Sequence, residues 1–188
     1  MDQAFYDAVA QNPVIAAAKD EEGLKRCLEL EDIRIVFLLS GNILNVGELV
    51  ARVKVKDKLA LVHADLIEGL SNREIAVDFL KKSTWADGIL STRPSFIRRA
   101  RELHMCTVLR VFLIDSMALE NVGNSDAVRP DFIEIMPGIS PNTIKKVCGA
   151  VKTPVLAGGL ISSKEDVIRA LEAGAMAIST TKCDVWLV

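Results

Sequence analysis

Short apolar runs rich in β-branched residues recur along this chain, and most are followed by a segment with helical periodicity. Eight such runs begin at Pro13, Ile33, Leu59, Gly88, Cys106, Phe132, Val155 and Ala177. Near-continuous apolar runs are typical of strands that are buried on both faces of a parallel sheet. Their alternation with helices predicts an α/β fold, because a helical crossover carries the chain back to begin the next parallel strand.

The segments between these runs have the spacing of amphipathic helices. They span residues 20–30, 45–54, 71–82, 94–103, 140–151 and 162–174. Pro94 suits the first turn of its helix, and Ser162 with Glu165 fits a capping box. Residues 114–126, which follow the fifth run, predict only a short or irregular helix.

Eight strand–helix units predict a small TIM-like (β/α)8 barrel with parallel strands. The chain has 188 residues, fewer than the roughly 250 usual for this architecture, and we expect one domain over residues 1–188. A doubly wound open sheet is the main alternative. The lack of a Gly-x-Gly-x-x-Gly pattern after the first run weakens that alternative for a dinucleotide-binding protein.

Composition narrows the classes of function. The formal net charge is −2, so any contact with nucleic acid must come from a local basic patch. The four cysteines have no Cys-x-x-Cys spacing, and we expect reduced thiols in a cytoplasmic protein. The apolar runs are too short to span a membrane, residues 1–13 do not resemble a signal peptide, and no His/Cys cluster indicates a metal site.

Polar residues follow the predicted strands where a barrel collects its functional groups. The early strands end at Lys19, at Asp65 with Glu68, and at Ser91 with Arg93. An acid/base or Mg²⁺ role for Asp65 and Glu68 is weakly indicated. The alternative is that these residues are polar only because strand ends become loops.

Two charged residues interrupt strands that we expect to be buried. Arg110 lies inside the fifth run and Glu134 inside the sixth, and neighbouring strands would allow the two side chains to pair. The pair would either fix the register of the barrel or form a charged floor beneath a ligand, with the guanidinium facing a phosphate or carboxylate. The two roles are compatible.

The last two strands end in residues that suit an anion. Barrels often bind phosphate with the loops after the seventh and eighth strands and with a short extra helix. Gly158 and Gly159 allow close approach of the backbone, and Ser179, Thr180 and Thr181 supply hydroxyl groups. We expect residues 182–188 to form the extra helix. The alternative is that the glycines only make a tight turn.

Basic residues cluster in two of the predicted helices. Candidates for contact with nucleic-acid phosphates are Arg98, Arg99, Arg101, Lys145 and Lys146. The alternative is a solvated helix face.

The motifs "FLLSGNI", "VHADLIEGL", "GILSTR", "DFIEIMPGI" and "PVLAGGLI" resemble those of the glycerol-3-phosphate-responsive antiterminator family, which regulates glycerol uptake operons in bacteria. The resemblance covers nearly the whole chain, and its motifs are specific in combination. The last residues, "TTKCDVWLV", depart from the more polar and longer ending of the family.

The resemblance implies a TIM-barrel regulator without catalysis. It would sense glycerol-3-phosphate as an effector, with no cofactor, and bind the leader mRNA of glycerol-utilisation operons. The phosphate would lie near Gly158, Gly159, Ser179 and Thr180, and the rim would include the polar and charged residues named above. On the residues alone, an enzyme acting on a small phosphorylated substrate remains the alternative, and the oligomeric state, including a homo-oligomer, stays open.

Overall fold

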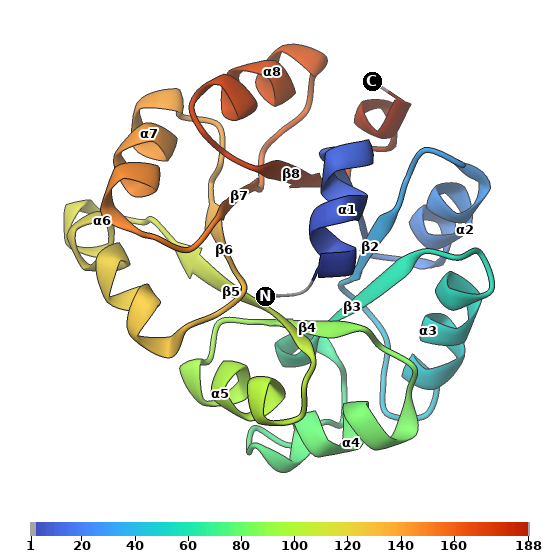
Figure 1. Cartoon of the computed structure of the whole chain (residues 1–188). Helices are drawn as coiled ribbons and strands as arrows, with labels where there is room; N and C mark the ends of the chain where they lie inside the picture. The colour runs from blue at the N-terminus through green and yellow to red at the C-terminus, as the bar shows by residue number, and fades with distance from the viewer. Residues whose placement is uncertain (1–2, 188) are drawn as a thin grey trace.

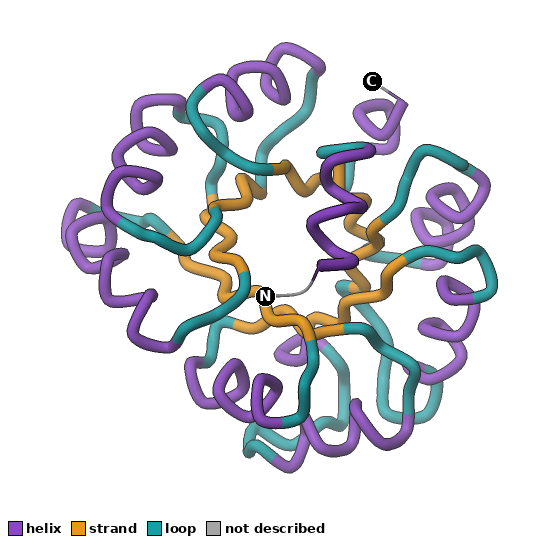
Figure 2. The backbone as a smooth tube through the Cα atoms, in the orientation of Figure 1, coloured by secondary structure: helices purple, strands orange, loops and turns teal. Residues whose placement is uncertain are grey.

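The computed structural model describes residues 3–187, in which eight parallel strands close into a barrel. The strands are β1 (Val14–Ala18), β2 (Ile35–Leu38), β3 (Leu59–His63), β4 (Gly88–Ser91), β5 (Cys106–Phe112), β6 (Phe132–Met136), β7 (Val155–Gly158) and β8 (Ala177–Thr180). Strand order follows chain order, and β8 pairs with β1 to close the ring (Figures 1 and 2). The predicted TIM-like (β/α)8 barrel is therefore confirmed.

Helices surround the barrel in the order that the sequence predicts. They are α2 (Glu21–Glu29), α3 (Val46–Lys54), α4 (Ile75–Ser83), α5 (Pro94–Glu102), α6 (Ser116–Asn121), α7 (Pro141–Ala150) and α8 (Lys164–Glu172), with 3-10 helices η1 (Ala64–Leu66), η2 (Val122–Val128) and η3 (Cys183–Leu187). The weak helix predicted after the fifth strand is confirmed, since α6 has six residues and buries none of them. The expected capping box is wrong by one position. Ser163 caps α8, and the carboxylate that reaches back belongs to Asp166.

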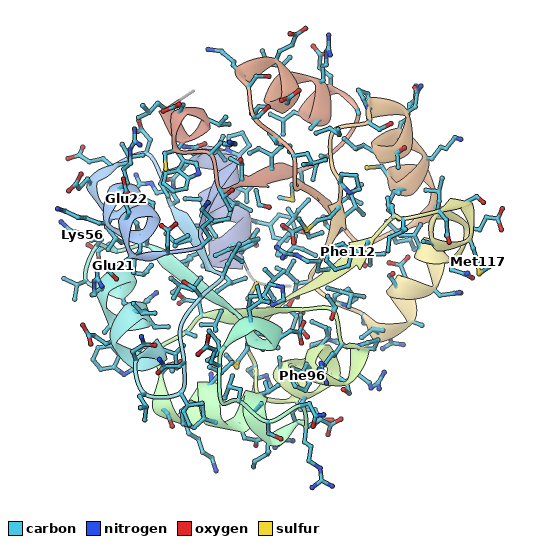
Figure 3. All side chains as sticks on the ribbon, turned by 180° about the vertical axis from the view of Figure 1, so that it is seen from behind. Glu21, Glu22, Lys56, Phe96, Phe112 and Met117 are labelled. Carbon is cyan, nitrogen blue, oxygen red and sulfur yellow. The ribbon has the colours of Figure 1, made fainter. Side chains whose placement is uncertain are left out.

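Alternation of side chains along the strands divides the core into two layers. One layer fills the barrel, with Phe37, Leu61 and Val108 among its buried members. The other lies between the strands and the outer helices, with Val36 and Val62 among its members; Figure 3 shows the side chains of both layers from the opposite side of the molecule. Both faces of the strands are buried, which explains their near-continuous apolar sequence.

An additional helix, α1 (Gln3–Gln11), precedes β1 and was missed by the sequence analysis. It crosses the end of the barrel where the strands begin, as Figure 1 shows from that side. Phe5 is fully buried there and packs against Phe132, with ring centroids 4.2 Å apart. Helix α1 therefore closes the amino-terminal end of the barrel, which leaves the opposite end for a ligand.

The structure also bears on two further expectations, which concern the cysteines and the length of the apolar segments. Within residues 3–187 none of the four cysteines forms a disulfide; Cys27 and Cys106 are buried and the other two are half-buried. Burial raises the pKa of the Cys27 thiol to about 12, which keeps it protonated. In the described part of the chain, no helix is both long and apolar enough to cross a membrane.

Candidate functional site

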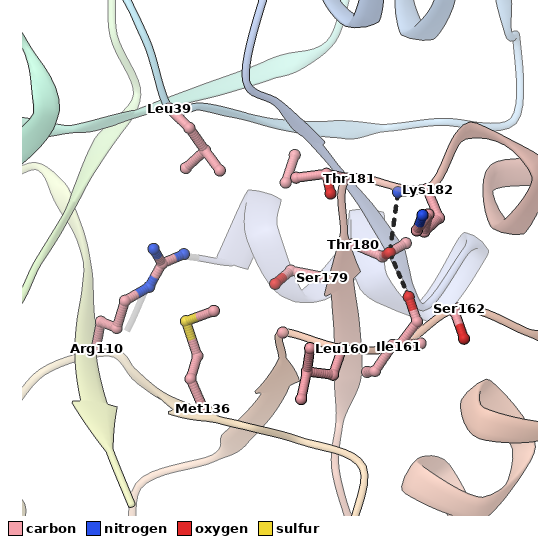
Figure 4. A pocket seen from close by; sticks show the side chains of 12 residues that line it. Leu39, Arg110, Met136, Leu160, Ile161, Ser162, Ser179, Thr180, Thr181 and Lys182 are labelled. Carbon is pink, nitrogen blue, oxygen red and sulfur yellow. Dashed lines mark hydrogen bonds between the residues drawn. The ribbon is translucent and has the colours of Figure 1, made fainter. Parts of the chain in front are cut away.

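A cavity of about 400 Å³ opens at the carboxyl-terminal end of the barrel, beside β5 to β8. Its walls come from strand ends and from the loops that follow β7 and β8, as the close view in Figure 4 shows. The lining residues are Ala17, Leu39, Arg110, Met136, Gly159, Leu160, Ile161, Ser162, Ser179, Thr180, Thr181 and Lys182. Five of the predicted ligand residues, Arg110, Gly159, Ser179, Thr180 and Thr181, thus share one cavity.

A buried ion pair forms the floor of this cavity. Arg110 and Glu134 are register partners on β5 and β6, and the Arg110 Nε donates a 2.6 Å hydrogen bond to Glu134 Oε2. The Ser179 hydroxyl donates to the other carboxylate oxygen, Oε1. Glu134 is fully buried, so it lies beneath the cavity and not in its lining. The predicted pairing is confirmed, and its geometry leaves the terminal nitrogens of the Arg110 guanidinium directed into the cavity (Figure 4).

Two glycines shape the loop after β7 for different reasons. A Cβ on Gly158 would lie 2.6 Å from Glu134 Oε1, so this position has no room for a side chain beside the buried carboxylate. Gly159 has a φ of +72°, and a Cβ there would lie 2.7 Å from Met136 Cε. Gly158 therefore accommodates the floor, whereas Gly159 turns the backbone along the cavity wall.

The Thr180 hydroxyl holds the loops after β7 and β8 together. It donates to the carbonyl of Ile161 at 2.7 Å and accepts from the backbone N–H of Lys182 at 3.1 Å. The indole Nε1 of Trp186 donates to the Thr180 carbonyl at 2.9 Å. Thr180 is thus committed to positioning its neighbours, in contrast to the ligand-binding role expected of its hydroxyl.

The final segment differs from the helix expected over residues 182–188. It forms the five-residue 3-10 helix η3, and Val188 lies outside the described residues. Val185 and Trp186 are buried, and they fix the end of the chain against the barrel. This packing explains the apolar residues at positions 185 and 186.

Lys19 lines a second cavity next to the first. This cavity of about 310 Å³ lies between the β1–α2 loop and η3, and it shares Thr181 and Lys182 with the main cavity. Its charged lining also includes Arg26, whose guanidinium lies 3.6 Å from the carboxylate of Asp184. Lys19 is therefore near the main cavity and outside its lining.

The remaining predicted rim residues form a separate cluster at β3 and β4. Asp65 accepts hydrogen bonds from the Ser91 hydroxyl at 2.9 Å and the Thr92 backbone at 2.7 Å, and its carboxylate lies 3.3 Å from Arg93 Nε. Glu68 is exposed, and its backbone pairs with that of Asn42. These contacts organise the loops after β3 and β4. Neither Asp65 nor Glu68 lines the main cavity, so their positions do not support an acid/base role there.

His63 is a buried polar residue that the sequence analysis left without a role. Its Nδ1 has no hydrogen-bond partner among residues 3–187, and the nearest carboxylate, that of Asp65, is 3.7 Å away. Burial and, to a smaller extent, the charge of Arg110 lower the pKa of His63 to about 4, while the charge of Asp65 opposes the shift. The imidazole is therefore neutral at pH 7.

Several lining residues carry no polar signal that the sequence analysis could have used. Leu39, Met136 and Leu160 provide an apolar wall. Lys182 directly follows the predicted Ser179–Thr181 group, so its position beside a phosphate-binding strand end could have identified it as a lining residue.

Within the described residues, no three His, Cys, Asp or Glu side chains are placed to hold a metal ion.

The predicted nucleic-acid contacts lie on the outside of the barrel. Arg99 is held in ion pairs with Asp78 at 2.5 Å and Glu102 at 2.7 Å, so it braces α4 against α5 and is not free for a phosphate. Arg98 is exposed on α5, as is Arg101. Lys145 and Lys146 are exposed on α7. The five residues thus do not form one surface.

Comparison with known proteins identifies the family of this chain. The model of the family described as "Glycerol-3-phosphate responsive antiterminator" matches residues 14–186. The chain belongs to this family.

Relatives of this chain agree with it in sequence and structure. The Escherichia coli (strain K12) protein YgcP is 40% identical over 177 residues, which cover 94% of this chain and 92% of YgcP. The crystal structure of the glycerol uptake operon antiterminator regulatory protein from Listeria monocytogenes is 36% identical, with a TM-score of 0.89 over 94% of this chain and 95% of that one. A related protein from Thermotoga maritima is 30% identical, with a TM-score of 0.81 over 93% and 98% of the two chains.

Solved barrel enzymes are more distant. Aldolases, an epimerase and a decarboxylase are 12–16% identical to this chain, which shows that they share the fold alone. The antiterminator relationship therefore identifies the chain as a member of a regulatory family.

Proposed function

We propose that this protein senses glycerol-3-phosphate in the main cavity and binds the leader mRNA of glycerol-utilisation operons, where it prevents premature termination of transcription. The observation that carries the proposal is the cavity of about 400 Å³ in a chain of the glycerol-3-phosphate responsive antiterminator family. It combines an anchored guanidinium, a lysine and two loops of small and hydroxyl residues, which is suitable chemistry for a small phosphorylated metabolite.

Each end of the metabolite has a matching part of the cavity. The phosphate lies beside the backbone of Gly159 and the side chains of Thr181 and Lys182, at the loops that barrels commonly use for phosphate. The glycerol end extends toward Arg110 and Met136. The Arg110 charge is already balanced by Glu134, whereas Lys182 makes no ion pair among residues 3–187, so Lys182 supplies the positive charge that a dianion requires.

Thermal unfolding with added ligands tests metabolite binding. A ligand that binds only the folded state at 100 times its dissociation constant stabilises it by about 2.7 kcal/mol, so glycerol-3-phosphate should raise the melting temperature and glycerol should not. Lys182→Met should remove most of this increase. Lys164→Met is the matched control, because Lys164 is exposed at the start of α8 outside the cavity lining. An equal response of both variants would place the ligand elsewhere.

Binding of a leader transcript tests the regulatory half of the proposal. Filter binding of a labelled leader RNA from a glycerol-utilisation operon should show an affinity that depends on glycerol-3-phosphate, because a sensor couples the two ligands. Lys182→Met should abolish the dependence on metabolite. RNA binding that is identical with and without the metabolite would overturn the sensing mechanism.

A further inference from the structure

The amino-terminal end of the barrel carries a band of basic and aromatic side chains that no part of the proposed function uses. Four consecutive helix-to-strand loops, which lead into β4, β5, β6 and β7, place exposed residues on this end. We call this band the basic rim and define it as Trp85, Arg101, His104, Arg129 and Lys152. Because β4 to β7 are neighbours in the barrel, the loops that precede them lie side by side (Figure 1).

A shallow cavity confirms that part of the basic rim is one surface. Arg101, Arg129 and Lys152 line a hollow of about 330 Å³, although they come from three different units of the chain. Among the described residues, their side chains make no ion pair. The three positive charges are therefore available to an anion.

The carboxylates in the same hollow are already used by the fold. Asp126 accepts from the backbone N–H groups of Lys152 and Thr153 and from the Thr153 hydroxyl, and these bonds lower the pKa of Asp126 against the opposing effect of burial. Asp131 accepts from the backbone and hydroxyl of Thr107. Two carboxylates against three cations leave the hollow with a net positive charge.

The aromatic member of the basic rim is unusually open. Trp85 exposes 73% of its surface in the loop before β4, where burial of a large aromatic ring would ordinarily be favourable. On the other side of the barrel, the loop before β2 exposes two acids, Glu31 and Asp32, and one cation, Arg34, so its net charge is negative. Positive charge and an open indole thus coincide on one half of this end.

From this juxtaposition we propose that the basic rim is the RNA-binding surface, with single-stranded RNA as the partner. The cations contact phosphates, and Trp85 stacks on an unpaired base, which is the pairing of groups that single-stranded RNA recognition uses. The inference rests on the proposed function, since it assigns a face to the leader transcript.

The metabolite and the RNA then occupy opposite ends of the same strands. Arg110 lies four residues beyond the start of β5, and a strand rises about 3.3 Å per residue, so the cavity floor is about 13 Å from the rim end of that strand. Strands β5 and β6 carry the Arg110–Glu134 pair at one end and the Thr107–Asp131 hydrogen bonds at the other. The two faces can therefore be tested independently.

Filter binding with two double variants of equal charge change tests the assignment. Arg101→Gln with Lys152→Gln removes two cations from the basic rim, and Lys145→Gln with Lys146→Gln removes two from the outer face of α7. The probe is a labelled leader RNA of a glycerol-utilisation operon at about 50 and about 200 mM KCl. We expect the rim variant to lose at least about tenfold in affinity at the lower salt concentration and its salt slope to become about 1.4 shallower, for two lost contacts with single-stranded phosphates. The α7 variant should bind within about twofold of the parent, because it leaves the rim intact.

Controls separate this inference from the proposed function. Trp85→Ala should weaken binding about tenfold with an unchanged salt slope, because stacking is not ionic. All variants should keep the thermal shift with glycerol-3-phosphate, which shows that they are folded. If the parent binds RNA and both double variants bind equally well, the basic rim is not the RNA face. If the parent binds no RNA, the proposed function fails together with this assignment.

A protein partner gives a different result. In a transcription assay with purified polymerase, a rim variant that keeps full RNA affinity but loses antitermination would show that the rim contacts the transcription machinery, and the RNA assignment would be overturned.

Discussion

The buried Arg110–Glu134 pair allows a quantitative test of the site's construction. Glu134→Gln removes the carboxylate charge while keeping its size. Arg110 exposes only 7% of its side chain, and Glu134 exposes none. Loss of one partner from a buried ion pair leaves an uncompensated charge and costs about 3–5 kcal/mol. We expect Glu134→Gln to lower the free energy of unfolding by this amount, and Arg110→Met to do the same.

The double variant separates the pair from its surroundings. Once both charges are gone, the amide oxygen introduced by Glu134→Gln still accepts from the Ser179 hydroxyl, as the carboxylate does in the parent, and no buried charge remains. The combined loss should therefore be smaller than the sum of the single losses, with a coupling of about 3 kcal/mol. Urea unfolding at pH 7 measures all four proteins.

A surface ion pair in the same protein provides the control. Arg169 and Glu165 are also 2.6 Å apart, but their side chains expose 59% and 70% of their surface. Glu165→Gln should cost less than about 1 kcal/mol, because solvent screens the pair. If the losses in free energy of unfolding for Arg110→Met and Glu134→Gln are additive, or if Glu165→Gln costs as much as Glu134→Gln, burial is not what makes the ion pair in the cavity floor important for stability.

Three further predictions concern packing, protonation and the end of the chain. Gly158→Ala should destabilise the protein, because its Cβ would lie 2.6 Å from a buried carboxylate oxygen. Gly149→Ala in α7 is the control, since its Cβ would meet nothing within 4 Å, and it should stabilise the protein by about 0.5–1 kcal/mol. Equal melting temperatures for the two variants would contradict the steric argument. The pKa of His63 in the folded protein is about 4, below the ordinary 6.5, so the unfolded chain binds the proton more readily. The free energy of unfolding should therefore fall by about 3 kcal/mol as the pH drops from about 6.5 to 4. His63→Leu should lack this pH-dependent loss when its unfolding is measured over the same range, and a variant with the pH profile of the parent would show that the imidazole is not buried as described. Trp186→Phe should cost about 1–3 kcal/mol by leaving the buried Thr180 carbonyl without its indole donor, and calorimetry that shows no loss would mean that the hydrogen bond does not anchor the tail.

The sequence was sufficient to predict the fold because the strand and the helix of each unit can be recognised from local hydrophobic periodicity. A run such as the one that begins at Cys106 is apolar on both faces, and the following segments carry helix caps and amphipathic spacing. Sequence also put Arg110 and Glu134 on neighbouring strands, where they could pair, and the structure supplied the register that sets them opposite each other. Helix α1 was missed because it is stabilised by packing of Phe5 on Phe132, and two residues this far apart in the chain leave no local pattern in the sequence.

The candidate site could be predicted only in part. Strand-end position identified Gly159, Ser179 and Thr181, because parallel strands bring their carboxyl ends to one face. It also pointed to Asp65, whose carboxylate is instead taken up by the loop after β4, and to the hydroxyls of Ser179 and Thr180, which line the cavity but donate to Glu134 and to the Ile161 carbonyl. Whether a polar side chain faces a cavity or bonds to its neighbours depends on rotamer and loop path, which the one-dimensional pattern does not contain.

By itself, then, the amino-acid sequence favoured the barrel and its strand order and allowed the buried ion pair, since these follow from local periodicity and from the rule that consecutive parallel strands are neighbours. Only the tertiary structure decided which charges are free. It committed Arg99 to Asp78 and left Arg101 open beside Lys152, far along the chain. The physical reason is that the effect of a charge depends on its distance from other charges and from solvent, and closure of the barrel sets both.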